Sequence, residues 1–458
     1  MKKINTLIFI FLTLISAMAQ TQQVQEPTTF SLQQAIDYGL GENYAVKNSV
    51  LQREMTNARK GEVMGSLLPQ VNGNADLLHY FHIQNTILEG AGGGSGFTAA
   101  YPWGQVVHGG LMLPNQFLPN AFASQVLFDK SAFSLQGAAK ANQDVAQKNI
   151  SKNKIDVTVS ITKAYYSVLV NEKQLLAINT NLARLDSVYK ETNARFQSGL
   201  ARNIEVSRTM VSLNNMREQQ QSVIRTVALS RSVLRYQMNL SEENPLTLTD
   251  SLHENQIDEI KQLLSTPIQK AYENRIEYSI IKSQQQFNAY DLKTAMAGHY
   301  PRLLAISTVG YNPSANQFSN LTQSDRWIQY SNVGLRLQVP IFAGFAVNYR
   351  VQQKRIQQKI TDNNKKSLEK EINLEVEQAL INLHNSVQTF NIQKDNLELA
   401  QKNLAVLRAE YEVGIALNVE VTTAEADLIQ AQTNYYQAVY SALVAKADYD
   451  KAVGNIVK

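Results

Sequence analysis

The sequence predicts a mainly helical chain built from two repeats, each ordered helix, strand, strand, helix. Three observations favour this fold class: a duplicated phrase, very long proline-free helical stretches, and short segments of period-two alternation between them. The phrase reads ARFQSGLARNIEV at 194–206 and AEYEVGIALNVEV at 409–421. Six of its thirteen positions are identical, which indicates an internal duplication.

Helical patterns cover most of the chain. The stretch 30–67 is polar and periodic and is followed by Pro69, and further helical stretches run over 131–196 and 344–411 without a proline. The last of these has 68 residues, and at ~1.5 Å per residue it is roughly 100 Å long. Helices of ordinary compact domains have ~10–14 residues, so an elongated helical protein is expected.

The apolar residues of the longest stretch form two seams with a spacing of seven. One seam is Leu383, Phe390, Leu397, Leu404 and Tyr411, and the other is Ile392, Leu399, Val406 and Val413. Nine residues separate the two seams, which is about half a turn around a helix. A helix with opposed seams has a neighbour on each side, as in a wall. The first repeat keeps the first seam (Val168, Leu175, Leu182, Tyr189, Phe196), but its second seam is weaker (Ala177, Arg184, Glu191, Ser198).

The duplicated phrase is predicted to form the tips of two long helical hairpins, at 194–206 and 409–421. Gly199 and Gly414 stand where a seam stops, the position at which a left-handed residue ends a helix. We expect Asn203 and Asn418 to be the N-caps of the returning helices.

Each repeat also holds two predicted strands, at 70–81 and 120–128 in the first and at 302–311 and 327–342 in the second. The last is amphipathic, with Val333, Leu335 and Leu337 alternating with polar residues and glycine. These lengths approach the ~9–11 residues of a membrane strand. Bacterial barrels need at least ~8 strands, and open edges are not tolerated in lipid. If these strands cross a membrane, four strands per chain require several chains to close one barrel, which predicts a homo-oligomer.

The N-terminus has the features of a secretory signal peptide over 1–19. Lys2 and Lys3 precede an apolar run that is too short to span a membrane, and Ala17-Met18-Ala19 is a cleavage signature. No cysteine follows, so we expect a cleaved signal and no N-terminal lipid anchor. The remaining domains are predicted as a first repeat at 20–240, an equatorial side segment at 241–266 and a second repeat at 267–458.

Composition argues against several classes of function. The formal charge is +4, and loss of the two signal lysines leaves +2, which disfavours a nucleic acid partner. The chain has no cysteine. His79 and His82 are three residues apart on a predicted strand and are expected on opposite faces, and the glycine-rich GAGGGSG at 90–96 lacks the lysine of a phosphate loop. We therefore predict no cofactor, no metal site and no enzymatic activity.

Taken together, the signal peptide, the duplicated units and the glycine-tipped hairpins resemble the TolC-like outer membrane efflux family. The most specific segments are FSLQQAIDYGLGEN (30–43), LLPQV (67–71) and YEVGIALNVEV (411–421). The resemblance implies a homotrimer whose α-helical barrel in the periplasm continues into a 12-stranded β-barrel in outer membrane lipid. It further implies a passive, gated channel of a tripartite efflux or type I secretion system, served by a periplasmic adaptor protein and an inner-membrane pump.

The resemblance also assigns site residues by position. The expected channel aperture consists of Glu420, Glu205, Thr423 and Tyr411, although Thr423 replaces a family aspartate and Ala416 a basic tip residue. The expected hairpin tips and adaptor contacts are Gly199, Leu200, Ala201, Asn203, Gly414, Ile415, Ala416 and Asn418.

Two alternatives stay open at this point. Glu205 and Glu420 lie in the first turn of a helix, where a carboxylate contributes ~0.3–1 kcal/mol by its interaction with the helix dipole. The other hypothesis is an acidic ring of Glu420 that favours cations. For the whole protein, the alternative function is an exported coiled-coil scaffold without a pore, which would not need detergent for extraction.

Overall fold

The computed structural model describes residues 29–456, apart from 84–85, 88–105, 108–112, 243, 245 and 253–270. The predicted signal peptide, the glycine-rich stretch 90–96 and most of the side segment 241–266 lie outside these residues. The described chain divides into two compact units, and each unit draws residues from both halves of the sequence. The predicted repeats at 20–240 and 267–458 describe a duplication in the sequence, and they do not coincide with the two compact units. The division into repeats stays a prediction.

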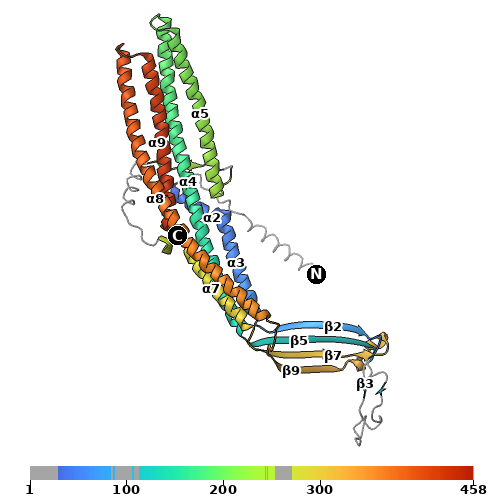
Figure 1. The fold of residues 1–458 in the computed structure, drawn as a ribbon. Helices are drawn as coiled ribbons and strands as arrows, with labels where there is room; N and C mark the ends of the chain where they lie inside the picture. The colour runs from blue at the N-terminus through green and yellow to red at the C-terminus, as the bar shows by residue number, and fades with distance from the viewer. Residues whose placement is uncertain are drawn as a thin grey trace, which may run out of the picture. The chain divides into compact units, whose positions relative to one another are not determined.

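The first unit comprises Met1–Asn48, Ile150–Arg275 and Glu371–Lys458. It holds α2 (Leu32–Glu42), α5 (Asn203–Met238), α9 (Asn418–Val453) and the larger parts of α4 (Lys130–Gln197) and α8 (Ala346–Glu412). It also holds η2 (Ala271–Glu273) and a short parallel pair, β1 (Thr29–Phe30) with β6 (Thr247–Leu248). Figure 1 shows α4 with α5 and α8 with α9 as two hairpins lying alongside each other.

The first predicted helix, 30–67, is in fact two helices, because Asn43 takes an extended conformation between α2 and α3 (Tyr44–Gly65). The Asn43 side chain donates from Nδ2 to the Gln237 carbonyl at 2.8 Å, which attaches the break to α5. At the other end of α2, the Ser31 hydroxyl accepts from the Gln34 amide, and the Gln34 side chain accepts from the Ser31 amide. This capping box fixes the start of α2.

The two seams of α8 differ in burial in a single chain. The first seam faces the protein: Leu383 and Phe390 pack with α9 in one core cluster, and Leu404 packs in another near the tip. The second seam is exposed, with Leu399 and Val406 each at 56%. Among the described residues, only one of the two predicted neighbours of α8 is therefore present.

The second unit comprises Ser49–Asn149 and Ile276–Lys370. Its helical part is α7 (Ile276–Ala297) with most of α3 and the N-terminal parts of α4 and α8. Its sheet has the order β2 (Gln70–His79), β5 (Asn115–Asp129), β7 (Arg302–Tyr311) and β9 (Gln329–Gln338), all antiparallel. The four long strands lie side by side in Figure 1.

Two strand lengths differ from the prediction. The strand predicted at 120–128 extends over Asn115–Asp129, because its first residues pair with β2 and with the short β8 (Ser314–Ala315). The strand predicted at 327–342 is shorter, because Trp327 closes the turn η4 (Ser324–Arg326) and Pro340 has no N–H to donate. The loop before η4 contains η3 (Phe318–Thr322), and β3 (Thr86–Ile87) pairs with β4 (Val106–Val107).

His79 is the last residue of β2 and His82 follows in a bend, so the expectation of opposite strand faces does not apply to this pair. No helix among the described residues is both long enough and apolar enough to cross a membrane.

Candidate functional site

The turn between the two helices of each hairpin is built around a left-handed glycine. Gly199 has a φ of 77° and Gly414 a φ of 82°, a conformation in which a Cβ is strained. At each turn the residue after the glycine donates back to the last helical turn: Leu200 to the Arg195 carbonyl and Ile415 to the Glu410 carbonyl, both at 2.8 Å. The prediction that the glycines end the helices is confirmed, and the bonds are those of a Schellman motif.

The predicted role of the two asparagines is wrong. Asn203 and Asn418 are the first helical residues of α5 and α9, and the N-cap positions belong to Arg202 and Leu417. Neither the Arg202 nor the Leu417 side chain forms a capping hydrogen bond with the start of its helix. At the start of α9, a different residue supplies a hydrogen-bond acceptor. The Leu417 amide donates to the Glu420 carboxylate at 2.7 Å. Asn418 instead has a buried amide nitrogen without a hydrogen-bond partner among the described residues.

The two acidic residues of the predicted aperture have different surroundings. Glu420 accepts a backbone hydrogen bond at the start of its own helix, which is the structural role that the helix dipole favours. Glu205 instead forms an ion pair with Arg202 at 3.1 Å. Each of these contacts lies within its own hairpin, so neither carboxylate joins the two hairpins.

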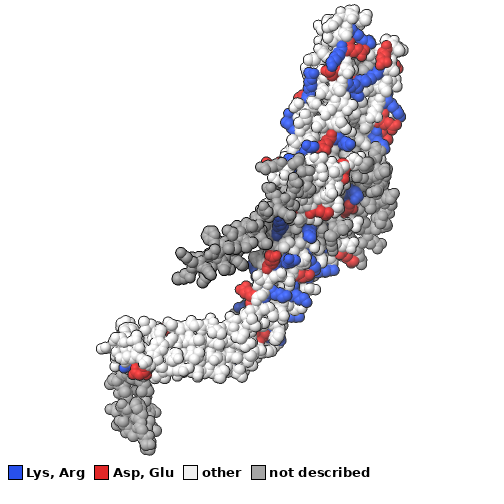
Figure 2. All heavy atoms as spheres, turned by 180° about the vertical axis from the view of Figure 1, so that it is seen from behind, with Lys and Arg blue, Asp and Glu red and all other residues white. Residues whose placement is uncertain are grey.

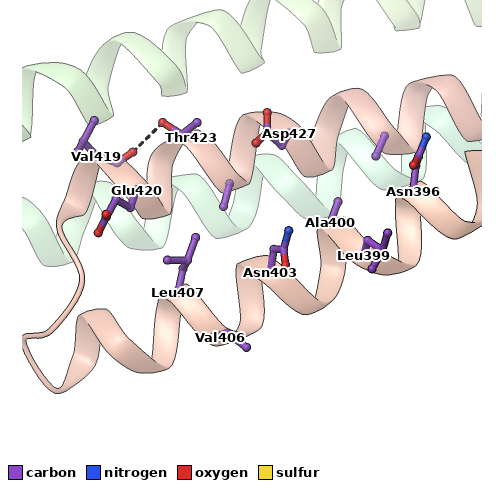
Figure 3. A pocket seen from close by; sticks show the side chains of 12 residues that line it. Asn396, Leu399, Ala400, Asn403, Val406, Leu407, Val419, Glu420, Thr423 and Asp427 are labelled. Carbon is purple, nitrogen blue, oxygen red and sulfur yellow. Dashed lines mark hydrogen bonds between the residues drawn. The ribbon is translucent and has the colours of Figure 1, made fainter.

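Glu420 and Thr423 share a groove of about 780 Å³ between α8 and α9 (Figure 3). Its walls are apolar at Leu399, Val406 and Leu407 and polar at Asn396, Asn403 and Asp427. The Thr423 hydroxyl donates to the Val419 carbonyl at 2.8 Å, as drawn in Figure 3. The groove thus brings together two of the four predicted aperture residues, with exposed members of the second seam beside them.

Tyr411 lies in a different cavity, of about 350 Å³, between α4, α8 and α9. The guanidinium of Arg195 lies 5.1 Å from the centre of the Tyr411 ring. This cation–π contact joins the first hairpin to the second, and such contacts contribute ~0.5–1 kcal/mol at exposed sites. Glu205 lines neither of these two cavities.

The predicted tip residues fall into an exposed and a buried set. Leu200 and Ile415 are 80% and 76% exposed at the ends of their hairpins, whereas Ala416 is buried. Leu417, which the sequence did not single out, is also exposed. Each tip therefore presents large apolar side chains to its surroundings.

A buried ion cluster near the tips was not predicted. Glu425 of α9 is 1% exposed and accepts from Arg408 of α8 at 2.7 Å, while Arg184 of α4 lies 3.6 Å away. Arg184 also donates to Asn181, whose amide donates to Gln432 of α9 at 2.6 Å. Burial lowers the pKa of Arg184, and the neighbouring Arg408 lowers it further, while Glu425 opposes the shift.

This cluster connects three helices from both hairpins. The sequence did contain one signal, because Arg184 interrupts the second seam of the first repeat. Without the fold, nothing in the sequence related that arginine to Glu425. No group of three or more metal-binding side chains occurs among the described residues.

The chain thus combines paired helical hairpins with glycine tips and an antiparallel sheet whose two edge strands, β2 and β9, are exposed. Residues 268–455 match the family model of the outer membrane efflux protein. The chain is 23% identical over 349 residues to the outer membrane protein TolC of Escherichia coli, covering 73% of this chain and 68% of that protein.

Solved structures show the same fold. A CusC structure is similar with a TM-score of 0.72 at 15% identity, covering 93% of this chain and 92% of that one. The CmeC outer membrane channel of Campylobacter jejuni is similar with a TM-score of 0.70 at 16% identity, covering 92% and 85%. Residues 268–455 thus match the outer membrane efflux family, and the chain as a whole is similar to TolC proteins, which are outer membrane proteins. The resemblance to the TolC-like family that the sequence indicated is confirmed.

Proposed function

We propose that this protein is the outer membrane channel of a tripartite efflux or type I secretion system. In this role it conducts substrates passively from the periplasm to the exterior through a tunnel made by three copies. Its partners are a periplasmic adaptor protein and an inner-membrane pump, and the pump supplies the energy. The matching family model is that of an outer membrane efflux protein, and a solved structure of similar fold is an outer membrane channel. Both favour a channel over the alternative of a scaffold without a pore, and over an enzyme.

The observation that supports this proposal best is the open sheet of the second unit. Among the described strands, none pairs with the outer edge of β2 or of β9, and each edge is ten residues long. Ile341, just beyond β9, is 95% exposed, and Val333, Leu335 and Leu337 of β9 are exposed as well. Unpaired backbone groups are not tolerated in lipid. Pairing of β9 in one copy with β2 of the next satisfies both edges, and three copies give 12 strands.

The helices of the first unit have matching unpaired faces. In Figure 1, α8 and α5 lie on opposite sides of the α4 and α9 pair. Exposed apolar side chains run along both: Leu374, Ile381, Ile392, Leu399 and Val406 on α8, and Val211, Leu229, Val233 and Tyr236 on α5. Contact of α8 in one copy with α5 of the next buries both stripes. Because the two faces differ, the contact is heterologous, and a rotation of one third of a turn between neighbouring copies closes it as a ring of three.

The tips form the periplasmic entrance in this proposal. Arg195 with Tyr411 and the Glu425 cluster hold the second hairpin against the first. An adaptor that contacts exposed Leu200, Ile415 and Leu417 more favourably in a splayed state shifts the population toward open tips. Glu420, Thr423, Glu205 and Tyr411 of the three copies then surround the aperture.

Single-channel recording in a planar bilayer tests conduction. Detergent-extracted protein is expected to insert and to give discrete conductance steps that depend on the tips. Ser198 and Val413 occupy equivalent positions in the two repeats, and cysteines there provide a lock. Export in cells should stop under oxidation and recover on reduction. Continued export with crosslinking confirmed would contradict opening at the tips, and absence of any conductance would contradict the channel.

A further inference from the structure

The charge of α8 reverses along its length. Residues 346–370 carry seven lysines and arginines and two carboxylates, whereas residues 371–412 carry three basic and seven acidic side chains. The first sixteen residues, 346–361, contain four basic side chains and no carboxylate. A solvated helix face normally mixes both signs, so this one-sided segment calls for a partner of opposite charge.

The basic segment begins directly beside an uncharged apolar surface. The face drawn in Figure 2 has almost no charged side chains along the strands of the second unit, and charged side chains of both signs appear where the helices begin. Large exposed side chains occupy the junction between the strands and the helices: Ile341, Phe342, Phe345, Tyr349 and Phe133. Aromatic residues with this placement are typical of a membrane–water interface.

Three of the basic side chains are available to a partner. Lys354 is paired with Asp291 at 2.8 Å. Arg350, Arg355 and Lys359 are exposed, and none of them forms an ion pair within the described residues. Asp362 and Glu369 are the carboxylates of the same segment, and both follow these three residues along the helix.

We propose that Arg350, Arg355 and Lys359 bind the phosphate groups of anionic phospholipids, in the leaflet at the helical end of the strands. This inference rests on the proposed function, because it requires the strands to cross the bilayer. Its support is charge complementarity next to an apolar face: a lipid supplies both a negative phosphate and an acyl chain. A soluble anion would not account for the exposed aromatic side chains at the junction.

The distances along α8 are compatible with this role. At ~1.5 Å per residue, Arg350 lies about 6 Å, Arg355 about 14 Å and Lys359 about 20 Å from the start of the helix. The headgroup layer is ~5–7 Å thick on each side, and charges act across roughly 8–10 Å at physiological salt. Long basic side chains also extend toward an interface. Arg350 is therefore expected to contribute most and Lys359 least.

The same helix contains a matched control. Arg355 and Lys359 are four residues apart and exposed, and so are Lys366 and Lys370, eleven residues further along. Eleven residues are close to three full turns, so both pairs lie on the same helix face. R355Q/K359Q and K366Q/K370Q therefore remove the same charge from the same face at different distances from the strands.

The test measures lipid preference in phosphatidylcholine vesicles that contain the full-length protein. Spin-labelled phosphatidylglycerol and phosphatidylcholine report the fraction of each lipid held at the protein surface. The wild type is expected to prefer phosphatidylglycerol roughly threefold to fivefold, and the preference should fall as salt is raised. R350Q is expected to lose most of this preference and R355Q/K359Q a smaller part of it, whereas K366Q/K370Q keeps it.

Two results overturn the inference: equal association of both lipids with the wild type, or equal loss in the two double variants. The second result would assign the effect to diffuse charge. Failure of the proposed function looks different, because the protein would then not float with the vesicles at all. Inorganic phosphate, compared with chloride at equal ionic strength, is expected to leave the preference unchanged.

Discussion

The two hairpin tips have nearly the same sequence but different surroundings. Both turns are built by a left-handed glycine with the same backbone bonds. Around them, Glu205 pairs with Arg202, whereas Glu420 bonds the start of its own helix. The position of Glu425 in the second repeat corresponds to Met210 in the first, and that of Leu399 to Arg184. Duplication has kept the turn and changed the faces that the hairpins present to their neighbours.

This comparison also shows what the sequence could predict. Heptad seams and a repeated turn depend on local spacing, so the long helices, the glycine terminators and the strand segments were accessible. The break at Asn43 was not, because it depends on a bond to the Gln237 carbonyl far along the chain. Arg202 and Leu417 lack capping side chains, so residue preference pointed to the neighbouring asparagines instead.

The site was less accessible than the fold for a related reason. The Glu425 cluster joins α4, α8 and α9, and its three members are unrelated by spacing. The four predicted aperture residues likewise have different surroundings, and these depend on packing between helices. Tyr411 faces α4 in one cavity, and Glu420 and Thr423 line another.

The largest expected effect comes from making the second seam of α8 polar, as it is in α4. L399N/V406N removes two exposed apolar side chains that the proposed neighbouring copy buries. Each such side chain contributes ~1.5–3 kcal/mol when fully buried, and a ring contains the contact three times. We expect the assembly to dissociate into smaller species, measured by the mass of the detergent-extracted protein.

The matched control is E191Q/S198A, which changes two consecutive positions of the second seam in the first repeat. Glu191 corresponds to Val406 of α8, and Ser198 to Val413. It should leave the mass unchanged. An intact assembly with L399N/V406N would show that α8 does not contact a second copy.

The next largest effect concerns the buried cluster. E425M copies the residue of the first repeat and leaves Arg184 and Arg408 without their carboxylate. Removing one partner of a buried ion pair costs ~3–5 kcal/mol, and the partial exposure of Arg408 places the expected loss at about 3 kcal/mol. Urea unfolding in detergent measures it.

R184L/R408L/E425M replaces the whole cluster by apolar residues and is expected to recover most of the lost stability. If the triple variant is no more stable than E425M alone, the cost arises from packing and not from unpaired charge.

A smaller effect is expected from a Cβ at the tips. G199A and G414A force alanine into a left-handed conformation, at ~1–2 kcal/mol each. No atom lies within 4 Å of the added Cβ at either position. The two variants should therefore lose the same free energy of unfolding. Thermal unfolding of the two variants checks this equality, and clearly unequal losses would mean that one tip contacts something that the other does not.

The smallest effect on stability is expected from neutralising Glu205 or Glu420. E205Q and E420Q should each cost ~0.3–1 kcal/mol, because each removes a negative charge from a helix start. Their effects on ion preference should differ: E420Q reduces cation preference, and E205Q changes it less, because Arg202 already pairs with the Glu205 carboxylate. Reversal potentials in a salt gradient distinguish them, and an unchanged preference with E420Q would leave Glu420 with a structural role alone.

The closure of one channel by three copies is tested most directly by mass. Cells are fractionated, the outer membrane is extracted with detergent, and the mass of the protein–detergent complex is determined with the detergent contribution subtracted. The account predicts three chains per particle, found only in the outer membrane fraction. A monomer or dimer that is recovered without detergent would leave the edges of β2 and β9 unpaired and would contradict it.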